Sequence, residues 1–400
     1  MLPASFQTAR PIIEKLEQNR HKAFFVGGCV RDLLLNRPMG DIDIATSATP
    51  AAIQRIFEKV IPVGIQHGTV IVRWGNESYE VTTFRTDGEY SDNRHPDDVQ
   101  FIDNVEQDLE RRDFTINALA MDKQGDIIDL FQGREDLKAK TIRTVGDGEQ
   151  RFREDSLRIA RALRFSSQLG FTIHPDTLSA MKKVKDDMEL LAVERLANEM
   201  EKLFAGTYLH TGISYLKETG VCMHLPVIKN HPWVIDRLPA SLQPLHTLGE
   251  VFALFHLLEQ KIDADVWVKA WKCSNKIKNQ AKLLIGAYHY FLTYGADRWL
   301  AYRLDSDNQE GFVRLANSLS PDRGLSMDHL TSMTGNLPIQ STREMDINGR
   351  EIAEMFPAKK QGPWLKQLIE SVEKMIVMGQ LKNSKSEIKE WIKWNPPEQD

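Results

Sequence analysis

Cysteine is scarce in this chain of 400 residues. The three cysteines, Cys29, Cys222 and Cys273, are odd in number and far apart, and no CxxC pair occurs. A disulfide framework and a zinc ribbon are therefore not expected. A reducing, cytoplasmic location is the expectation that follows.

Long apolar runs and a secretory leader are also missing from the sequence. No apolar run approaches the roughly 18 residues that a membrane-spanning helix needs, so a membrane partner is not expected. The first five residues lack the charged and apolar regions that begin a signal peptide.

The chain has no excess of basic charge. It carries 51 Lys and Arg against 56 Asp and Glu, a formal net charge of −5, which argues against a uniformly basic nucleic-acid-binding domain. The distribution is uneven, because residues 1–150 hold 18 basic and 25 acidic side chains and residues 151–400 hold 33 and 31. The 42% of hydrophobic residues is typical of a globular protein, and the length predicts two to three domains at roughly 150 residues each.

The first 150 residues alternate short strands with helices. Period-two or apolar runs predict strands at 23–26, 41–45, 68–74 and 78–84, the last two joined as a hairpin at Gly75-Asn76. Thr49-Pro50 predicts the start of a helix over 51–60. The polar segment 85–98 is expected to be a long exposed loop.

After residue 150 the apolar spacing becomes helical almost throughout. Helices are predicted at 156–169, 175–187, 193–204, 212–219, 247–260, 264–272, 276–294, 307–318, 350–355 and 363–378. The predicted fold class is therefore α+β, with a small mixed α/β head followed by an all-α remainder.

Two carboxylates in a predicted strand are the first chemical feature. Asp41 and Asp43 are two residues apart, so a strand would place them on one face, where they repel unless a cation lies between them. Mg²⁺ typically binds one or two carboxylates together with substrate phosphates. A lone Asp-x-Asp is more often an exposed pair of acids, and only the neighbouring residues favour a metal site.

The neighbouring residues suit a phosphate. Gly27-Gly28 ends an apolar strand, where backbone N–H groups can approach an anion closely, and Arg31 can reach a phosphate bidentately. With Glu80 as a third strand acid, the set describes a site for in-line displacement on a nucleoside triphosphate, with two metal ions stabilising the attacking and leaving oxygens. A simple glycine turn and a solvated Glu80 are the structural alternatives.

Two charged segments complete the candidate site. Arg111-Arg112 can clamp a triphosphate or form salt bridges to Glu106, Asp108 and Glu110. In the segment 151–165, helical spacing places Glu154, Asp155, Arg158 and Arg161 on the side opposite an apolar arc. A solvated, salt-bridged face is the usual meaning of such a pattern.

The functional interpretation of this segment is base recognition. Cytosine and adenine both present an amino donor beside a ring-nitrogen acceptor. Asp155 can accept from the amino group and Arg158 can donate to the ring nitrogen, whereas uracil and guanine would leave groups unpaired. An Asp-x-x-Arg pair on one helix face would thus act as a protein template for C and A.

Five segments carry a resemblance to a known family. In order they are FFVGGCVRDLLLNRPMGDIDIAT, DLERRDFTINALA, DLFQGREDL, IRTVGD and RFREDSLRIARALRF, and they closely resemble class II tRNA nucleotidyltransferases, the CCA-adding enzymes of the nucleotidyltransferase and poly(A) polymerase superfamily. The resemblance implies a catalytic head at 1–150, a base-recognising neck at 151–205, a body at 206–300 and a tRNA-binding tail at 301–400.

The resemblance also implies an activity and residue roles. The family adds C, C and A to the 3′ end of tRNA without a template, using CTP, ATP and Mg²⁺. Several roles carry over by motif: nucleotide contact for Gly28 and Arg31, metal binding for Asp41 and Asp43, triphosphate or ribose binding for Arg112, base reading for Asp155 and Arg158, orientation of Arg158 for Glu154, and completion of the pocket for Arg161 and Arg164.

Other functions stay open at this point. The charged loop at 85–98 favours full CCA addition over CC-only addition, while a partial CC- or A-adding enzyme or a poly(A) polymerase shares the head motifs. A non-catalytic tRNA-binding protein is the alternative from another class, and the intact Asp41-Ile42-Asp43 counts against it. RNA contact is expected in the helical remainder, at two lysine clusters: Lys269, Lys272, Lys276, Lys278 and Lys282, and Lys382, Lys385, Lys389 and Lys393 near Trp391 and Trp394.

Overall fold

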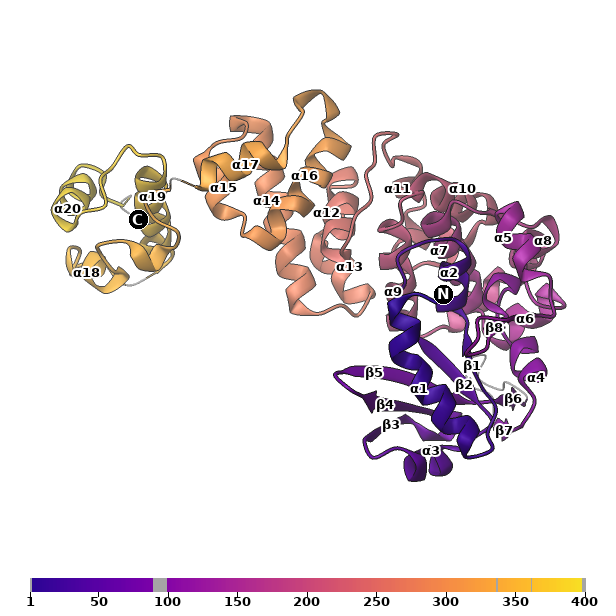
Figure 1. Cartoon of the computed structure of the whole chain (residues 1–400). Helices are drawn as coiled ribbons and strands as arrows, with labels where there is room; N and C mark the ends of the chain where they lie inside the picture. The colour runs from indigo at the N-terminus through magenta and orange to yellow at the C-terminus, as the bar shows by residue number, and fades with distance from the viewer. Residues whose placement is uncertain (1, 89–98, 336, 361, 398–400) are drawn as a thin grey trace. The chain divides into compact units, whose positions relative to one another are not determined.

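The chain forms two compact units, residues 1–236 and residues 237–400. The computed structural model describes residues 2–88, 99–335, 337–360 and 362–397 (Figure 1). No helix within these ranges is long and apolar enough to cross a bilayer. The fold is α+β, as predicted. The first unit combines a sheet with helices, and the described residues of the second unit form helices.

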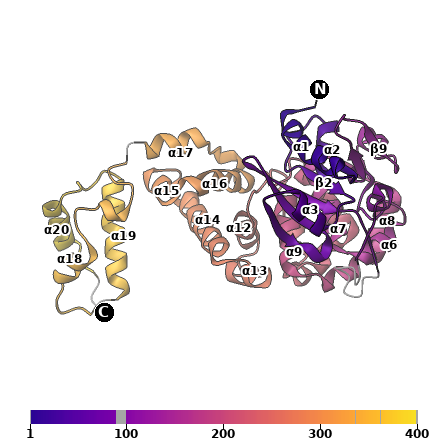
Figure 2. The ribbon, with the colours of Figure 1, turned by 60° about the horizontal axis from the view of Figure 1, so that its bottom comes forward.

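A seven-stranded sheet forms the centre of the first unit, in the order β3-β4-β5-β2-β1-β8-β9. Its strands are β1 (Ala23–Val26), β2 (Asp43–Thr46), β3 (Val60–Gly64), β4 (Thr69–Trp74), β5 (Glu77–Thr83), β8 (Leu119–Met121) and β9 (Ile127–Asp129). β2 and β5 are parallel, and the other neighbours are antiparallel. Helix α1 (Ala4–Gln18) packs its apolar face on the sheet, with the Phe6 ring 4.8 Å from that of Phe25 (Figures 1 and 2).

The predicted strands are largely confirmed, with one shift. β1 and the hairpin of β4 and β5 form as expected, but β2 begins at Asp43 rather than at residue 41. In the antiparallel register that places Phe25 opposite Ile44, residue 42 would need Gly27 as its partner. Gly27 has a φ of 74°, which turns the chain away from the sheet. Asp41 therefore lies just before the strand, so the expectation of two aspartates within one strand is wrong.

Shorter elements surround the sheet. Helices α2 (Gly28–Leu34), α3 (Pro50–Ile56), α4 (Val105–Glu110) and α5 (Gly133–Ala139) connect the strands, and β6 (Arg85–Asp87) pairs with β7 (Val99–Phe101). The predicted helix over 51–60 ends early, because the chain from Val60 enters β3. Thr49 caps α3 as predicted, accepting a hydrogen bond from the Ala52 backbone N–H at 3.3 Å. Most of the predicted loop at 85–98 lies outside the described residues.

Helices complete the first unit. They are α6 (Gly148–Glu154), α7 (Leu157–Leu169), α8 (Pro175–Val184), α9 (Val193–Phe204), α10 (Leu209–Thr219) and the short α11 (Trp233–Asp236). One small parallel pair, β10 (Thr141–Ile142) with β11 (Thr172–Ile173), was not predicted.

The helix predicted at 156–169 is confirmed as α7, but Glu154 and Asp155 do not continue it, although their spacing places them on its charged face. Asp155 has φ −145° and ψ 100°, so α6 ends before it and α7 begins two residues later. The Asp155 carboxylate accepts a hydrogen bond from the Leu157 backbone N–H at 3.1 Å. A short acidic side chain that bonds a nearby N–H in this way competes with helical hydrogen bonding.

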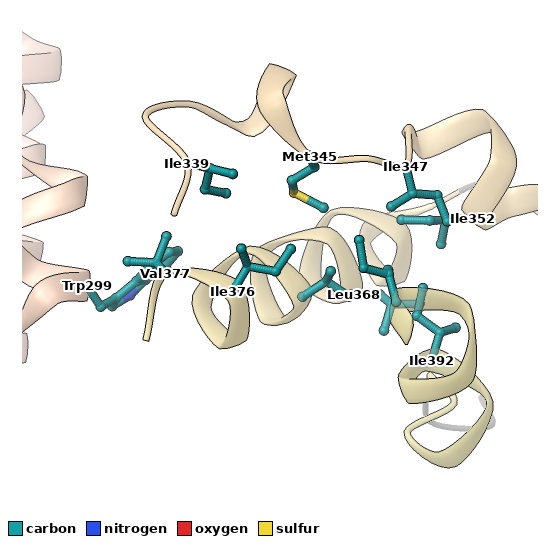
Figure 3. Packing of buried hydrophobic residues seen from close by; sticks show 11 residues of the cluster. Trp299, Ile339, Met345, Ile347, Ile352, Leu368, Ile376, Val377 and Ile392 are labelled. Atoms are coloured by element: carbon teal, nitrogen blue, oxygen red, sulfur yellow. The ribbon is translucent and has the colours of Figure 1, made fainter. Parts of the chain in front are cut away.

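The second unit is helical in its described residues, as predicted. Its helices are α12 (Leu248–Leu258), α13 (Ala264–Ala270), α14 (Asn275–Tyr294), α15 (Arg298–Arg303), α16 (Ser306–Leu319), α17 (Met327–Thr334), α18 (Gly349–Glu354), α19 (Pro363–Val377) and α20 (Lys385–Trp394). Figure 3 shows how α19 directs Leu368, Ile376 and Val377 into one apolar cluster with Trp299 of α15. That cluster joins α18, α19 and α20 to α15.

Close backbone contact at Gly206 generates a stability prediction. A Cβ there would lie 2.5 Å from the backbone oxygen of Ser167 in α7. Gly206→Ala should lower the free energy of unfolding by about 1–3 kcal/mol, because the backbone must move to make room. Chemical denaturation followed by circular dichroism measures the change.

Gly286 provides the control for that prediction. It lies exposed inside α14, and a Cβ there would meet nothing within 4 Å. Gly286→Ala should be neutral or stabilise by up to about 1 kcal/mol. Equal stability of the two variants would contradict the packing described for Gly206.

Candidate active site

A cleft of about 520 Å³ in the first unit gathers most of the predicted site residues. The sheet, α2 and the helices after residue 147 all contribute to its walls. The predicted residues that line it are Gly28, Arg31, Asp43, Glu80, Arg112, Asp155, Arg158, Arg161 and Arg164. Asp41 and Glu154 do not line the cleft, although Asp41 is two residues before Asp43 and Glu154 directly precedes Asp155.

Two carboxylates, those of Asp43 and Glu80, meet at the sheet end of the cleft. Asp43 of β2 is the direct register partner of Glu80 on the neighbouring parallel strand β5. Burial, and then repulsion from Glu80 and Asp41, raises the pKa of the Asp43 carboxyl to about 6, although Arg112 opposes this. Like charges held this close favour binding of a cation.

The donor set at this point fits a hard divalent cation that also takes ligands from a substrate. Oxygen ligands from one or two carboxylates, completed by phosphates, are what Mg²⁺ prefers. Within the described residues, no three His, Cys, Asp or Glu side chains form a metal-binding group by themselves. The acids thus provide a partial ligand set, as expected where a phosphate supplies the remainder.

The turn before α2 brings arginines to the other side of the acids. Gly27 allows this approach, since a Cβ at its position would lie 2.9 Å from Nη1 of Arg112. Arg31 of α2 donates from Nη1 to Oδ1 of Asn117 at 2.7 Å. Asn117 in turn donates to Asp113 at 3.1 Å, so one chain of hydrogen bonds runs along the floor of the cleft.

Arg111 and Arg112 share one buried acid. Asp108 is 1% exposed, and its two oxygens lie 2.8 Å from Nη2 of Arg111 and 3.2 Å from Nη2 of Arg112. Burial acts to raise the pKa of Asp108, but the two arginines outweigh it and lower that pKa. Both arginines also line the cleft, so the salt bridge positions them there.

Asp155 and Arg158 both line the cleft, but not as neighbours on one helix. Asp155 lies in the break between α6 and α7, where Nη2 of Arg195 from α9 is 2.8 Å from its Oδ2. Arg158 is 9% exposed and donates to Glu154 at 2.6 Å and to the backbone oxygen of Arg111 at 3.1 Å. The expectation of a shared helix face is wrong, yet each side chain is held by a partner of opposite charge.

The remaining arginines of α7 are paired as well. Arg161 lies 2.6 Å from Asp113, which is 7% exposed. Burial tends to raise the pKa of Asp113, but Arg161 and the Asn117 amide overcome it and lower the pKa to about 2. Arg164 forms an ion pair with Glu199 of α9 at 2.6 Å.

Sequence reasoning missed several residues of the cleft. They are Asp113, Asn117, Phe165, Arg195 and the Arg164 partner Glu199. Arg195 and Glu199 stand four residues apart in a helix that was predicted correctly, and Glu199 is buried. A buried acid in an amphipathic helix points to a charged partner elsewhere, but not to which one.

Three family models match successive parts of the chain. The "Poly A polymerase head domain" matches residues 23–143, the "Probable RNA and SrmB- binding site of polymerase A" matches 170–231, and the "tRNA nucleotidyltransferase domain 2 putative" matches 245–392. A "CCA-adding enzyme" of Oceanobacillus iheyensis is 48% identical over the full length of both chains. Another, of Bacillus mycoides, is 40% identical over 97% of this chain and 98% of its own length.

The chain belongs to the CCA-adding enzymes. It is therefore a nucleotidyltransferase, and this confirms the family expected from the motifs. A solved structure of the Bacillus stearothermophilus CCA-adding enzyme in complex with CTP is 37% identical, covers 98% of both chains and has a TM-score of 0.84. A Thermotoga maritima relative complexed with tRNA, at 20% identity and a TM-score of 0.62, shares the fold. Nucleotidyltransferases of this family generally use a divalent metal ion.

The buried pair of Asp113 and Arg161 generates a prediction on pH. Asp113→Asn should destabilise the protein by about 2–3 kcal/mol at pH 7, because Arg161 loses its counter-charge. The folded pKa of Asp113, about 2, lies below the value of an unfolded aspartate. The stabilisation is therefore complete above roughly pH 4 and is lost as pH falls toward 2.

Urea denaturation at pH 7, 4 and 3 measures this dependence. The gap between Asp113→Asn and the parent should narrow between pH 4 and 3. Asp126→Asn, which replaces an exposed acid of the same unit, should change stability by less than about 0.5 kcal/mol. A gap that is constant down to pH 3 would refute the depressed pKa.

Proposed function

We propose that this chain adds C, C and A to the 3′ end of tRNA without a nucleic-acid template, using CTP and ATP and releasing pyrophosphate. The observation that carries the proposal is that one cleft is lined both by the strand acids Asp43 and Glu80 and by the base-reading candidates Asp155 and Arg158. The names of the relatives and the CTP complex of a structure 37% identical support the same activity.

The strand acids are proposed to hold Mg²⁺. Asp41 and Asp43 would be its protein ligands, with the Glu80 carboxylate beside them. When bound there, Mg²⁺ supplies electrostatic stabilisation of the attacking and leaving oxygens in a two-metal, in-line displacement at the α-phosphate. The role of Asp43 is to present an ionised carboxylate in a place where burial and like charge disfavour ionisation without a cation.

The arginines are proposed to bind the triphosphate and complete the nucleotide pocket. Arg31 lies in α2, which begins at the Gly27-Gly28 turn, and Arg112 lies over that turn. Both are oriented by hydrogen bonds to the protein, to Asn117 and Asp108 respectively, so little side-chain freedom is lost when a phosphate binds. Arg161 and Arg164 would complete the pocket from α7.

Asp155 and Arg158 are proposed to read the base. A carboxylate acceptor and a guanidinium donor match the amino group and ring nitrogen that C and A share, and mismatch U and G. Glu154 holds Arg158, and Arg195 holds Asp155. Asp155 lies in the break between α6 and α7, and Arg158 lies in α7. The two proposed base-reading residues therefore do not share the single helix face expected from the sequence.

The helical remainder is proposed to contact the tRNA. Parts of the two lysine clusters are held by internal ion pairs, since Lys278 and Lys282 contact Asp265 and Lys385 contacts Glu351. The division into a head at 1–150, neck at 151–205, body at 206–300 and tail at 301–400 belongs to this proposal. The charged sequence at 85–98 favours full CCA addition over CC-only addition.

An extension assay tests the proposed function. Purified protein is incubated with a tRNA transcript that ends at the discriminator base, with CTP and ATP singly and together. Addition of three residues with both nucleotides is the expected result. A stop after CC, or long A tails, would overturn full CCA addition in favour of a related enzyme, and no product would indicate a non-catalytic protein.

The metal site generates a prediction that separates activity from stability. Asp43→Asn and Asp41→Ala should each lower transfer from both CTP and ATP by at least about a thousandfold, because the metal loses a ligand. Asp43→Asn should not lower the melting temperature in metal-free buffer at pH 8, because it removes repulsion from Glu80. Glu77→Gln, at the exposed start of β5, is the control that should retain activity.

Base reading generates a second prediction. Asp155→Ala should lower the preference for CTP over UTP by about tenfold or more, because one charge-assisted hydrogen bond to the base is lost. Single-nucleotide incorporation with all four nucleotides measures this preference. Asp187→Ala, which removes an acid paired with Arg153, should leave the preference unchanged. Equal loss with all four nucleotides in Asp155→Ala would refute the template role.

A further inference from the structure

One aromatic ring lies among three arginines of the cleft. Phe165 of α7 is 3% exposed and lines the cleft. The guanidinium carbons of Arg164, Arg31 and Arg161 lie over its ring, 4.1, 5.1 and 5.4 Å from the centroid. All three distances are within the roughly 6 Å at which the face of a ring attracts a cation.

Each of these arginines also has a carboxylate partner. The pairs are Arg31 with Asp32 at 2.9 Å, Arg161 with Asp113 at 2.6 Å and Arg164 with Glu199 at 2.6 Å. The three acids come from different parts of the chain, whereas Phe165 contacts all three arginines. The ring is therefore a contact that all three arginines share.

The ring itself is held firmly. Phe114 packs edge-on against it, with centroids 5.8 Å apart and planes at 88°. Phe114 is fully buried, and this contact fixes the ring without using any polar group. A fixed ring gives the arginines one preferred arrangement before a nucleotide binds.

We propose that Phe165 is a positioning residue for nucleotide binding, in which the electron-rich ring holds Arg31, Arg161 and Arg164 in the arrangement that receives the nucleotide. The inference rests on the proposed function, because it concerns the affinity of the same cleft for CTP and ATP. If the ring of Phe165 only filled space, a change in its charge distribution at constant shape would not change nucleotide affinity. If the ring attracts the arginines, the same change lowers that affinity.

Progressive fluorination tests the proposal at nearly constant shape. Phe165 is replaced by mono-, tri- and pentafluoro-phenylalanine, which weaken the attraction of the ring for cations step by step. KM for CTP and for ATP should rise with each step, by about tenfold in total, with a smaller change in kcat. Phe165→Leu, which removes the ring, should raise KM at least as much. Phe165→Tyr, which keeps an aromatic ring, should retain most of the affinity of the parent for CTP and ATP.

The same series at Phe6 is the matched control. Phe6 is fully buried and packs on Phe25 of β1, so fluorination there should leave KM unchanged. A constant KM across the Phe165 series, in variants whose circular dichroism matches the parent, would overturn the role of Phe165. Extension of tRNA by the unmodified protein tests the proposed function separately. Only the absence of that extension would overturn the proposed function.

Discussion

Pairing of buried charge is the constraint on which this cleft depends. A charged group that leaves water is costly unless an opposite charge and hydrogen bonds replace its hydration. The cleft brings arginines together from α2, the segment after α4, α7 and α9, and acids such as Asp108 and Asp113 compensate them. The side chains are therefore oriented before any substrate arrives.

The same pairs also join the parts of the first unit. Asp113 follows α4 and holds Arg161 of α7, while Arg195 and Glu199 of α9 hold residues of the α6–α7 region. The Asp113–Arg161 pair thus joins the sheet-containing residues to the later helices, and the pairs of α9 join those helices to one another. A change in one pair is expected to be felt in both stability and substrate affinity.

Local pattern predicted much of the fold and failed where tertiary contacts decide. Alternation and apolar runs predicted β1 and the β4–β5 hairpin, whereas β3, which has an exposed middle with Pro62, was not predicted. Helical spacing places Asp155 on the charged face of the following helix, but its extended backbone ends α6 there and its side chain accepts a hydrogen bond from the Leu157 N–H.

Motif order predicted the residues that face the cleft better than it predicted their geometry. Gly28, Arg31 and Arg112, which the motifs single out, all line the cleft. The partners Arg195 and Glu199 could not be assigned, because ion pairs between distant segments leave no spacing pattern in the sequence. The fold decides which acid meets which arginine.

The position of Asp43 opposite Glu80 has a wider consequence. Neighbouring strands are about 4.8 Å apart, a distance set by main-chain hydrogen bonds and not by side chains. The backbone of the sheet therefore fixes the spacing of Asp43 and Glu80. Asp155 and Arg158 lie at the junction of two helices, and side-chain packing can change the angle between helices. Under the proposed function, substitutions at the helix junction can therefore change which base is selected while the spacing of the strand acids stays the same.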